Sequence, residues 1–592
     1  MDADMRFEGT GAKAAGEPFG KYAPLPFMGS AALSDPLGIQ DAWQELGRGL
    51  LGNPRHLFDA QREYATSWAS LVNSMTCRLF GLEAEPVAAP EADDRRFADA
   101  MWEESPFFDF LKKAYLLNAR SWTSFVDGAP GLDERSRRRL DFFLRQTIDA
   151  LAPTNFFATN PKALRTAFET GGASALAGLR NALRDFDPAS GRLRNPMCSP
   201  DAFEVGKDVA ATLGKVVYRN RLIELIQYAP TTAKVHRRPI LLVPPWMNKF
   251  YVLDLRPENS MVKWLVERGH SVFVVSWFNP DSSSADMDFE DYMLEGPLAA
   301  LRAIESATGE REVNAVGYCL GGILLSALAA WLHADKDEER DRLAGITLFA
   351  TMVDFSDTGD ISVFIDEKTL PPLADAIARE GFLSGQSVGD AWRAVRANEL
   401  FWSFHINNYL LGQEPPKLDL LFWNSDPTNM PAAAHLFLMR NMYLENRLCK
   451  PGGLTLAGRS IDMSKVKTPA YLLATFDDHI APWRTAYLSA GLFGGKTEFV
   501  LGGSGHIAGV INHPGKEKYG YRTAKKIAAD ADEWLASSSR HEGSWWPHWD
   551  RWLSTLGGGE VKARIPGTGG LPALEDAPGS YVMRPMPRGR GV

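Results

Sequence analysis

Three residues in the second half of the chain are of types that together perform nucleophilic catalysis. Cys319 stands between an apolar, strand-like run ending at Val316 and a helix-forming stretch of small apolar residues. Asp478 and His506 each come soon after a further apolar run of strand character. A thiol nucleophile, an imidazole that takes its proton and a carboxylate that orients the imidazole make a complete acyl-transfer set. The sequence therefore predicts a covalent, cysteine-based chemistry.

The residues around Cys319 indicate how the thiol is presented. Gly317 precedes it by two positions and Gly321 follows it by two, so the segment is expected to run strand, sharp turn, helix. Glycine is needed where strand and helix come so close that a Cβ would clash. This is the nucleophile elbow of α/β-hydrolases, with Cys in place of the usual Ser, and the order Cys, Asp, His is the order of that fold's triads. Taken alone, the elbow would also suit a buried structural cysteine. The two partners favour the catalytic interpretation.

Composition narrows the class of protein. The chain has 592 residues, a formal net charge of −9 and 45% hydrophobic residues, which is typical of a globular protein of about two domains without a nucleic-acid surface. Its four cysteines, Cys77, Cys198, Cys319 and Cys449, are far apart, so neither a disulfide framework nor a zinc site is expected. We expect no metal, no secretory signal and no transmembrane helix, and a reducing cytoplasm suits a nucleophilic thiol.

Changes in composition and in the spacing of apolar residues divide the chain into regions. Residues 1–35 and the Gly/Pro-rich tail 557–592 are predicted to be disordered. Residues 36–215 carry apolar residues at helical spacing and are predicted to form a mainly helical N-terminal domain. Short strand-like runs then alternate with helices through 216–556, which predicts an α/β catalytic domain. The stretch from about 354 to 446 interrupts this alternation and is expected to form a lid.

Across residues 94–512 the chain resembles the class I polyhydroxyalkanoate synthases. The segments that carry the resemblance are DRRF from Asp94, YLLN from Tyr115, PPWMNKFY from Pro244, GYCLGG from Gly317, DFSDTG from Asp354, LFWNSD from Leu421, DHIAPW from Asp478 and GHIAGVIN from Gly505. The elbow alone is not specific, whereas this combination is. The length of the chain also favours the class that works with one kind of subunit.

The resemblance implies that the protein polymerises (R)-3-hydroxyacyl-CoA, with 3-hydroxybutyryl-CoA as the expected donor, and releases CoA. Cys319 would hold the acyl group as a thioester, His506 would activate the thiol, and Asp478 would orient His506. The substrate carries the coenzyme A, and no other cofactor is expected. The resemblance also implies a homodimer in the cytoplasm at the surface of a polyester granule, where granule-associated proteins could join it.

Further site residues are expected around the triad. The backbone N–H of Leu320 follows the nucleophile and should donate to the oxyanion. The second donor should come from the loop after the strand 241–243. Pro244 and Pro245 have no N–H, so Trp246 or Met247 is the candidate.

The lid should contribute Trp423, Asn424 and Asp426 to the substrate pocket. Asp477 and Asp478 are adjacent, and only one can face His506; the motif resemblance favours Asp478. We expect His479 to be a loop histidine that faces solvent.

Two other functions stay open at this stage. A cysteine hydrolase of the same fold would use the same acyl-enzyme and differ only in whether water reaches it. A non-catalytic granule-coat protein could bind polymer through the N-terminal helices. A complete Cys, Asp and His set favours an enzyme over the coat protein.

Overall fold

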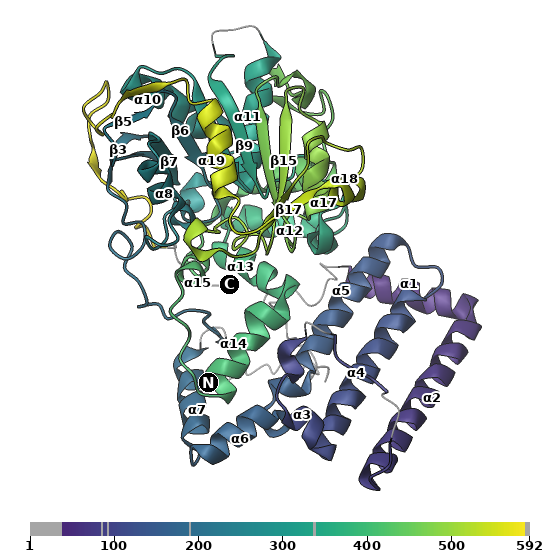
Figure 1. The fold of residues 1–592 in the computed structure, drawn as a ribbon. Coiled ribbons are helices and arrows are strands. Elements are labelled where there is room, and N and C mark those ends of the chain that lie inside the picture. The colour runs from purple at the N-terminus through teal and green to yellow at the C-terminus, as the bar shows by residue number, and fades with distance from the viewer. Residues whose placement is uncertain (1–37, 84–86, 92–93, 189–190, 336–338, 586–592) are drawn as a thin grey trace, which may run out of the picture.

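The computed structural model describes residues 38–83, 87–91, 94–188, 191–335 and 339–585, so the predicted disorder of 1–35 lies outside the described residues. The chain forms a hydrolase body around a large sheet and a separate group of N-terminal helices (Figure 1). The N-terminal helices are α1 (Ile39–Gly52), α2 (Pro54–Leu79), α3 (Met101–Glu104), α4 (Pro106–Asp127), α5 (Glu134–Ala150), α6 (Pro161–Glu169) and α7 (Ala173–Asp185).

The hydrolase body is built on an 11-stranded sheet of order β17-β16-β15-β14-β9-β8-β6-β7-β4-β3-β19. Its strands are β3 (Gly214–Arg219), β4 (Ile223–Tyr228), β6 (Ile240–Val243), β7 (Val272–Trp277), β8 (Val313–Tyr318), β9 (Leu343–Phe349), β14 (Ala470–Thr475), β15 (Thr497–Gly502), β16 (Tyr521–Thr523), β17 (Ser539–His541) and β19 (Glu575–Asp576). The six strands from β15 to β7 are parallel, and antiparallel strands complete both edges. The predicted α/β-hydrolase fold is confirmed, as are the strand-like runs that indicated it.

Helices cover both faces of the sheet, because its parallel strands are apolar on both sides. One core includes α10 (Ala299–Thr308), α11 (Leu320–Ala334) and α17 (Trp483–Leu488), and the other includes α8 (Met261–Glu267) and α19 (Trp546–Thr555). The side chains of β6 alternate between the two cores. Leu241 and Val243 pack into the first, while Ile240 and Leu242 pack into the second. Within the described residues, no helix combines the length and apolarity needed to cross a membrane.

The predicted lid is a largely helical insertion between β9 and β14. Its main elements are the helical turns 359–364, α12 (Leu370–Glu380), α13 (Gly385–Val395), α14 (Ser403–His405) with its flanking π-helical turns, α15 (Asp419–Asn424), α16 (Ala432–Leu438) and the turn 439–444. In Figure 1 the helices α13 and α14 lie between the hydrolase body and the N-terminal helices.

The prediction of a disordered tail was wrong for residues 557–585. The strand β18 (Glu560–Lys562) pairs with β5 (Lys234–His236), and β19 pairs with β3 at the edge of the large sheet. Farther on, Ser580 and Tyr581 bond to the buried carboxylate of Glu224. The Gly/Pro-rich composition permits turns between these contacts, and strand partners far back in the sequence supply the order. Residues 586–592 lie outside the described part of the chain.

Candidate active site

Cys319 lies at the sharp turn between β8 and α11. Its backbone has φ 51° and ψ −118°, a left-handed conformation that a side chain rarely adopts and that marks a functional turn. A Cβ on Gly321 would overlap the carbonyl oxygen of Val243, and one on Gly317 would overlap Gly322. The glycines therefore allow the elbow to press against the end of β6. The thiol is partly exposed and stands at the N-terminus of α11, where the helix dipole favours negative charge.

His506 and Asp478 meet beside the elbow. The Nδ1 atom of His506 lies 2.7 Å from Oδ2 of Asp478, and both side chains are buried. Asp478 Oδ1 accepts hydrogen bonds from the backbone N–H groups of Ile480 and Ala481 at 2.9 and 2.8 Å. These bonds fix the carboxylate in place beside the imidazole. Asp477 is exposed, so Asp478 is the acid that faces the imidazole.

The charge balance at His506 favours the imidazolium. Burial lowers its pKa, whereas the Asp478 carboxylate and negative charge on Cys319 raise it, as do hydrogen bonds to both side chains. The net effect raises the pKa of His506 to about 10. The imidazole is therefore placed between an acid that orients it and the thiol whose proton it can accept.

Contacts that the sequence did not reveal hold the histidine loop. The hydroxyl of Tyr318, the residue before the nucleophile, donates to the carbonyl of His506 at 2.9 Å, and the two rings stack. The N–H of Asp477 donates to the carbonyl of Ser504, which links the acid loop to the histidine loop. Tyr318 lies within the elbow motif, but nothing local indicates a partner 188 positions away.

One expected oxyanion donor belongs to the elbow itself, and the candidates for the other belong to the loop after β6. Leu320 is the first residue of α11, where N–H groups have no acceptor within the helix. Trp246 and Met247 lie in the loop after β6. The carbonyl of Val243 at the end of β6 and that of Pro244 at the start of the loop lie against Gly321. Both loop residues stay candidates for the second donor.

One lid residue lies within electrostatic range of the nucleophile. Tyr443, in the turn 439–444, is close enough to Cys319 for negative charge there to raise the tyrosine pKa further, after burial has raised it most. Two of the residues predicted to line the pocket, in and just after α15, form hydrogen bonds with the segment 249–251. Trp423 donates its indole N–H to the carbonyl of Lys249 at 2.7 Å, and Asp426 accepts a hydrogen bond from Tyr251. Asn424 is half-buried at the end of the same helix. A substrate-lining role for these three stays a prediction.

Comparison with known proteins places this arrangement in a family. The family described as "Poly-beta-hydroxybutyrate polymerase (PhaC) N-terminus" matches residues 93–265, and the α/β hydrolase fold matches residues 239–512. A poly(3-hydroxyalkanoate) polymerase of Methylorubrum extorquens is 44% identical over 96% of this chain and 93% of its own. The chain belongs to the poly(3-hydroxyalkanoate) polymerase family. It is accordingly an acyltransferase of the polyester-forming type.

Two further likenesses are weaker. The poly(3-hydroxyalkanoate) polymerase subunit PhaC of Cupriavidus necator is 40% identical over 89% of this chain and 88% of its own. Among solved structures, a monoacylglycerol lipase of Paleococcus ferrophilus covers 57% of this chain and 98% of its own with 14% identity and a TM-score of 0.32. That last likeness is too distant to bear on the site of this family member.

The expected position of His479 was wrong. The ring is largely enclosed rather than facing solvent, and it lies 6.5 Å from the ring of Trp392 on α13. Burial lowers the pKa of His479 to about 4, and the nearby charges of Arg396 and His506 act in the same direction. A lid helix covers this loop, and no local pattern in the sequence of this polymerase indicates that.

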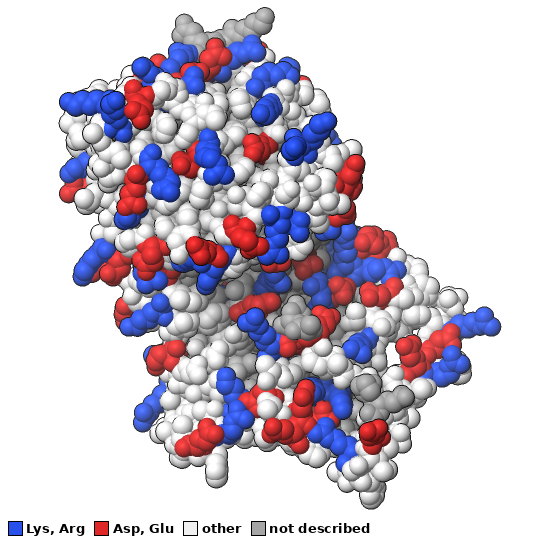
Figure 2. All heavy atoms as spheres, viewed as in Figure 1, with Lys and Arg blue, Asp and Glu red and all other residues white. Residues whose placement is uncertain are grey.

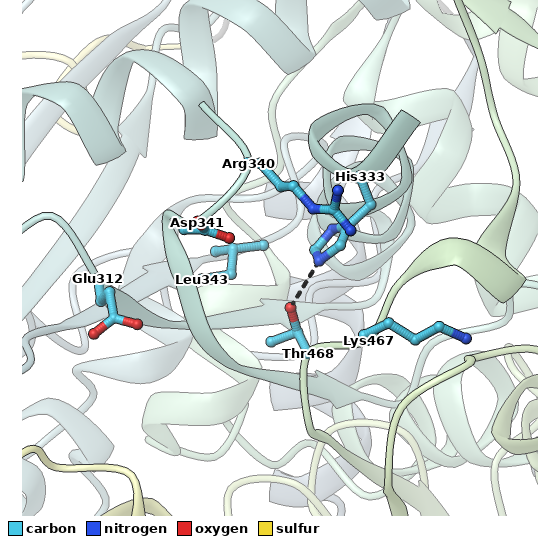
Figure 3. A pocket seen from close by; sticks show the side chains of 7 residues that line it. All are labelled: Glu312, His333, Arg340, Asp341, Leu343, Lys467 and Thr468. Atoms are coloured by element: carbon cyan, nitrogen blue, oxygen red, sulfur yellow. Dashed lines mark hydrogen bonds between the residues drawn. The ribbon is translucent and has the colours of Figure 1, made fainter. Parts of the chain in front are cut away.

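One pocket lies away from this chemistry. It has a volume of about 260 Å³ and is lined by Glu312, His333, Arg340, Asp341, Leu343, Lys467 and Thr468 (Figure 3). His333 lies near the end of α11 and the other six lie near the starts of β8, β9 and β14, whereas the triad lies beyond the strands' carboxyl ends. In the part of the chain that the structure describes, no three His, Cys, Asp or Glu side chains could together hold a metal ion.

Proposed function

We propose that this protein polymerises (R)-3-hydroxyacyl-CoA, with 3-hydroxybutyryl-CoA as donor, into polyhydroxyalkanoate through a thioester on Cys319. The observation that carries the proposal is the contact of His506 with both Asp478 and Cys319 at a nucleophile elbow. Membership of the polymerase family supports the choice of substrate.

The first step is acylation. His506 accepts the thiol proton, and the sulfur of Cys319 attacks the thioester carbon of the substrate. The tetrahedral oxyanion is stabilised by the N–H of Leu320 and by a donor from the loop after β6. When it collapses, the bond to the CoA sulfur breaks, and His506 returns the proton to CoA. One thioester replaces another, so the exchange is nearly isoenergetic and leaves an acyl group that is still reactive.

The second step is chain extension. The 3-hydroxyl of another hydroxyacyl unit attacks the thioester carbon on Cys319, and His506, oriented by Asp478, accepts the hydroxyl proton. An ester bond forms, the bond to the Cys319 sulfur breaks, and the sulfur recovers its proton from His506. A hydrolase would use water here instead. The lid residue Tyr443, which lies within electrostatic range of Cys319, supports exclusion of water from the intermediate.

The cellular setting belongs to the same proposal. The enzyme acts as a homodimer in the cytoplasm at the surface of the polyester granule, together with granule-associated proteins. It needs no cofactor beyond the CoA that the substrate brings. Exposed apolar side chains in the N-terminal region, such as Phe58 on α2 and Phe80 directly after it, support a role of that region in assembly or granule attachment.

One incubation tests the proposal. Purified protein is mixed with 3-hydroxybutyryl-CoA, and free thiol and turbidity are followed together, with the Cys319→Ala variant as control. Thiol release with turbidity is the expected result. Thiol release with only free 3-hydroxybutyrate would make the protein a hydrolase, and release by the variant would exclude Cys319 as the nucleophile.

A further inference from the structure

The loop after β6, residues 244–249, depends on contacts with other segments of the chain for its position. It carries both candidates for the second oxyanion donor, but it begins with two prolines and lacks a strand or helix of its own. Its start lies against the elbow, where the carbonyls of Val243 and Pro244 approach Gly321. An oxyanion donor works only at about 2.7–3.1 Å from the developing charge, so small shifts of this loop should affect the rate.

Two lid residues hold one side of the loop through its carbonyls. Thr428 donates its hydroxyl to the carbonyl of Trp246 at 2.7 Å and its N–H to that of Met247 at 3.0 Å. The indole N–H of Trp423 donates to the carbonyl of Lys249 at 2.7 Å. These bonds engage only backbone carbonyls, and the side chain of Lys249 has partners elsewhere in the chain.

The side chain of Lys249 fixes that end to the C-terminal segment. Lys249 is 3% exposed, and its Nζ donates to the carbonyls of Val582 and Arg584, both at 2.7 Å. Burial lowers the pKa of Lys249, the carboxylate of Asp426 opposes that shift, and the charge of Arg584 adds to it. A buried ammonium is costly without such partners, so the C-terminal segment and Lys249 depend on each other.

The C-terminal segment is itself anchored at the far edge of the sheet. Glu575 and Asp576 pair with β3. Ser580 and Tyr581 then bond to Glu224, which is fully buried. The two carbonyls that receive Lys249 come directly after this anchored stretch. The position of the loop beside the nucleophile is thereby linked to the edge of the sheet.

We propose that Lys249 is a positioning residue for thioester chemistry. Bound to the carbonyls of Val582 and Arg584, it holds the loop 244–249 where an N–H of that loop completes the oxyanion hole at Cys319. The inference rests on the proposed function and gives the last described residues of the chain a role in the reaction, although they carry no catalytic group.

The test compares two reactions of the same thiol in Lys249→Met, which keeps an unbranched side chain, one atom shorter, and removes its charge. Acylation is followed as single-turnover CoA release from 3-hydroxybutyryl-CoA. Alkylation of Cys319 by iodoacetamide is a displacement at a saturated carbon and forms no oxyanion. Acylation should fall by about 10- to 100-fold, part of what loss of a whole oxyanion donor costs. Alkylation should stay within about twofold of wild type, because the elbow and His506 are unchanged.

Two variants with shortened C-termini form the second part of the experiment. Ending the chain at Tyr581 removes both acceptors and keeps the contacts to Glu224, whereas ending it at Pro585 keeps both acceptors. The first ending should reproduce the acylation loss of Lys249→Met, and the second should not. Combining the Tyr581 ending with Lys249→Met should cost little more than either alone, since they break one interaction. Lys215→Met, which also contacts the C-terminal segment through Asp576, is the matched control and should acylate normally.

The outcomes separate this inference from the proposed function. If wild-type protein does not acylate Cys319, the proposed function fails. If wild type acylates and Lys249→Met acylates equally fast, the positioning role is overturned. If acylation and alkylation fall together in both Lys249→Met and the chain ending at Tyr581, Lys249 supports only the fold, and the proposal is overturned as well.

Discussion

The hydrolase body and the N-terminal helices bury their residues very differently. In α11, which follows the nucleophile, 13 of 15 residues are buried, whereas α2 buries only Leu71 and Ser74 among its 26. The strands β6, β7, β8 and β14 are buried along their whole length. A rigid core of this kind can hold the strained turn at Cys319. The N-terminal helices lack such support and contain no triad member.

The two regions meet through the lid. Arg139 on α5 forms a buried ion pair with Asp366 of the lid, and Arg145 binds Asp360. Asn398 of the lid donates to Asp149. Charged side chains of both signs gather along the junction of the two bodies in Figure 2. Through these contacts the N-terminal helices can influence the site by way of the insertion that carries Tyr443, at a distance from the bond chemistry.

The largest effect is expected from removal of the nucleophile in the hydrolase body. Cys319→Ala should abolish CoA release, because the reaction has no other acyl acceptor, while Ala at Cys77, Cys198 or Cys449 should leave substantial activity. Thiol release from 3-hydroxybutyryl-CoA is the measurement. An active Cys319→Ala enzyme would mean that the elbow is only a structural turn.

The second prediction separates two adjacent carboxylates. Asp478→Asn should lower turnover by about 10³- to 10⁴-fold, because the amide keeps the shape but cannot stabilise the charged imidazole. Asp477→Asn should be mild, since that side chain is exposed. Steady-state turnover and single-turnover acylation of both variants are compared. A crippled Asp477→Asn enzyme would contradict the geometry around His506.

The third prediction tests the link between the two regions. Arg139→Met leaves the buried carboxylate of Asp366 without its ionic partner, and breaking such a pair costs about 3–5 kcal/mol. Hydrogen exchange should become faster in the lid, and polymer formation should fall by about tenfold, while iodoacetamide still alkylates Cys319. Arg138→Met is the control, because the Arg138–Asp357 pair is exposed and worth little. Unchanged exchange in the lid would show that the N-terminal helices do not act through it.

The fourth prediction concerns pH and the core of the site. The pKa of His506 is raised from 6.5 to about 10 in the folded protein, so its protonation stabilises the fold in full below about pH 6.5. That contribution should be lost as pH rises toward about 10. The free energy of urea unfolding of wild type, minus that of His506→Gln, should therefore shrink across this window. A constant difference would show that Asp478 and Cys319 do not hold the proton on His506.

Much of the fold and the three central side chains could be predicted from the sequence, because their signals are local. A strand, a glycine turn and a helix around Cys319 lie within a few residues of one another. The apolar runs before Asp478 and His506 indicate strands in the same way. Parallel strands point their carboxyl ends to one edge, so the three side chains were expected to converge there. The structure brings them together as predicted.

The tertiary structure alone decided what the sequence leaves open, because the decisive contacts join distant segments. Residues 557–585 are rich in turn formers, and only their pairing with β3 and β5 orders them. His479 is enclosed because a lid helix happens to pack over it. Lys249 reads as an ordinary surface lysine until the carbonyls of Val582 and Arg584, more than 300 positions later, bury its charge. Local propensity selects each element, whereas burial and hydrogen bonding between remote segments select their partners.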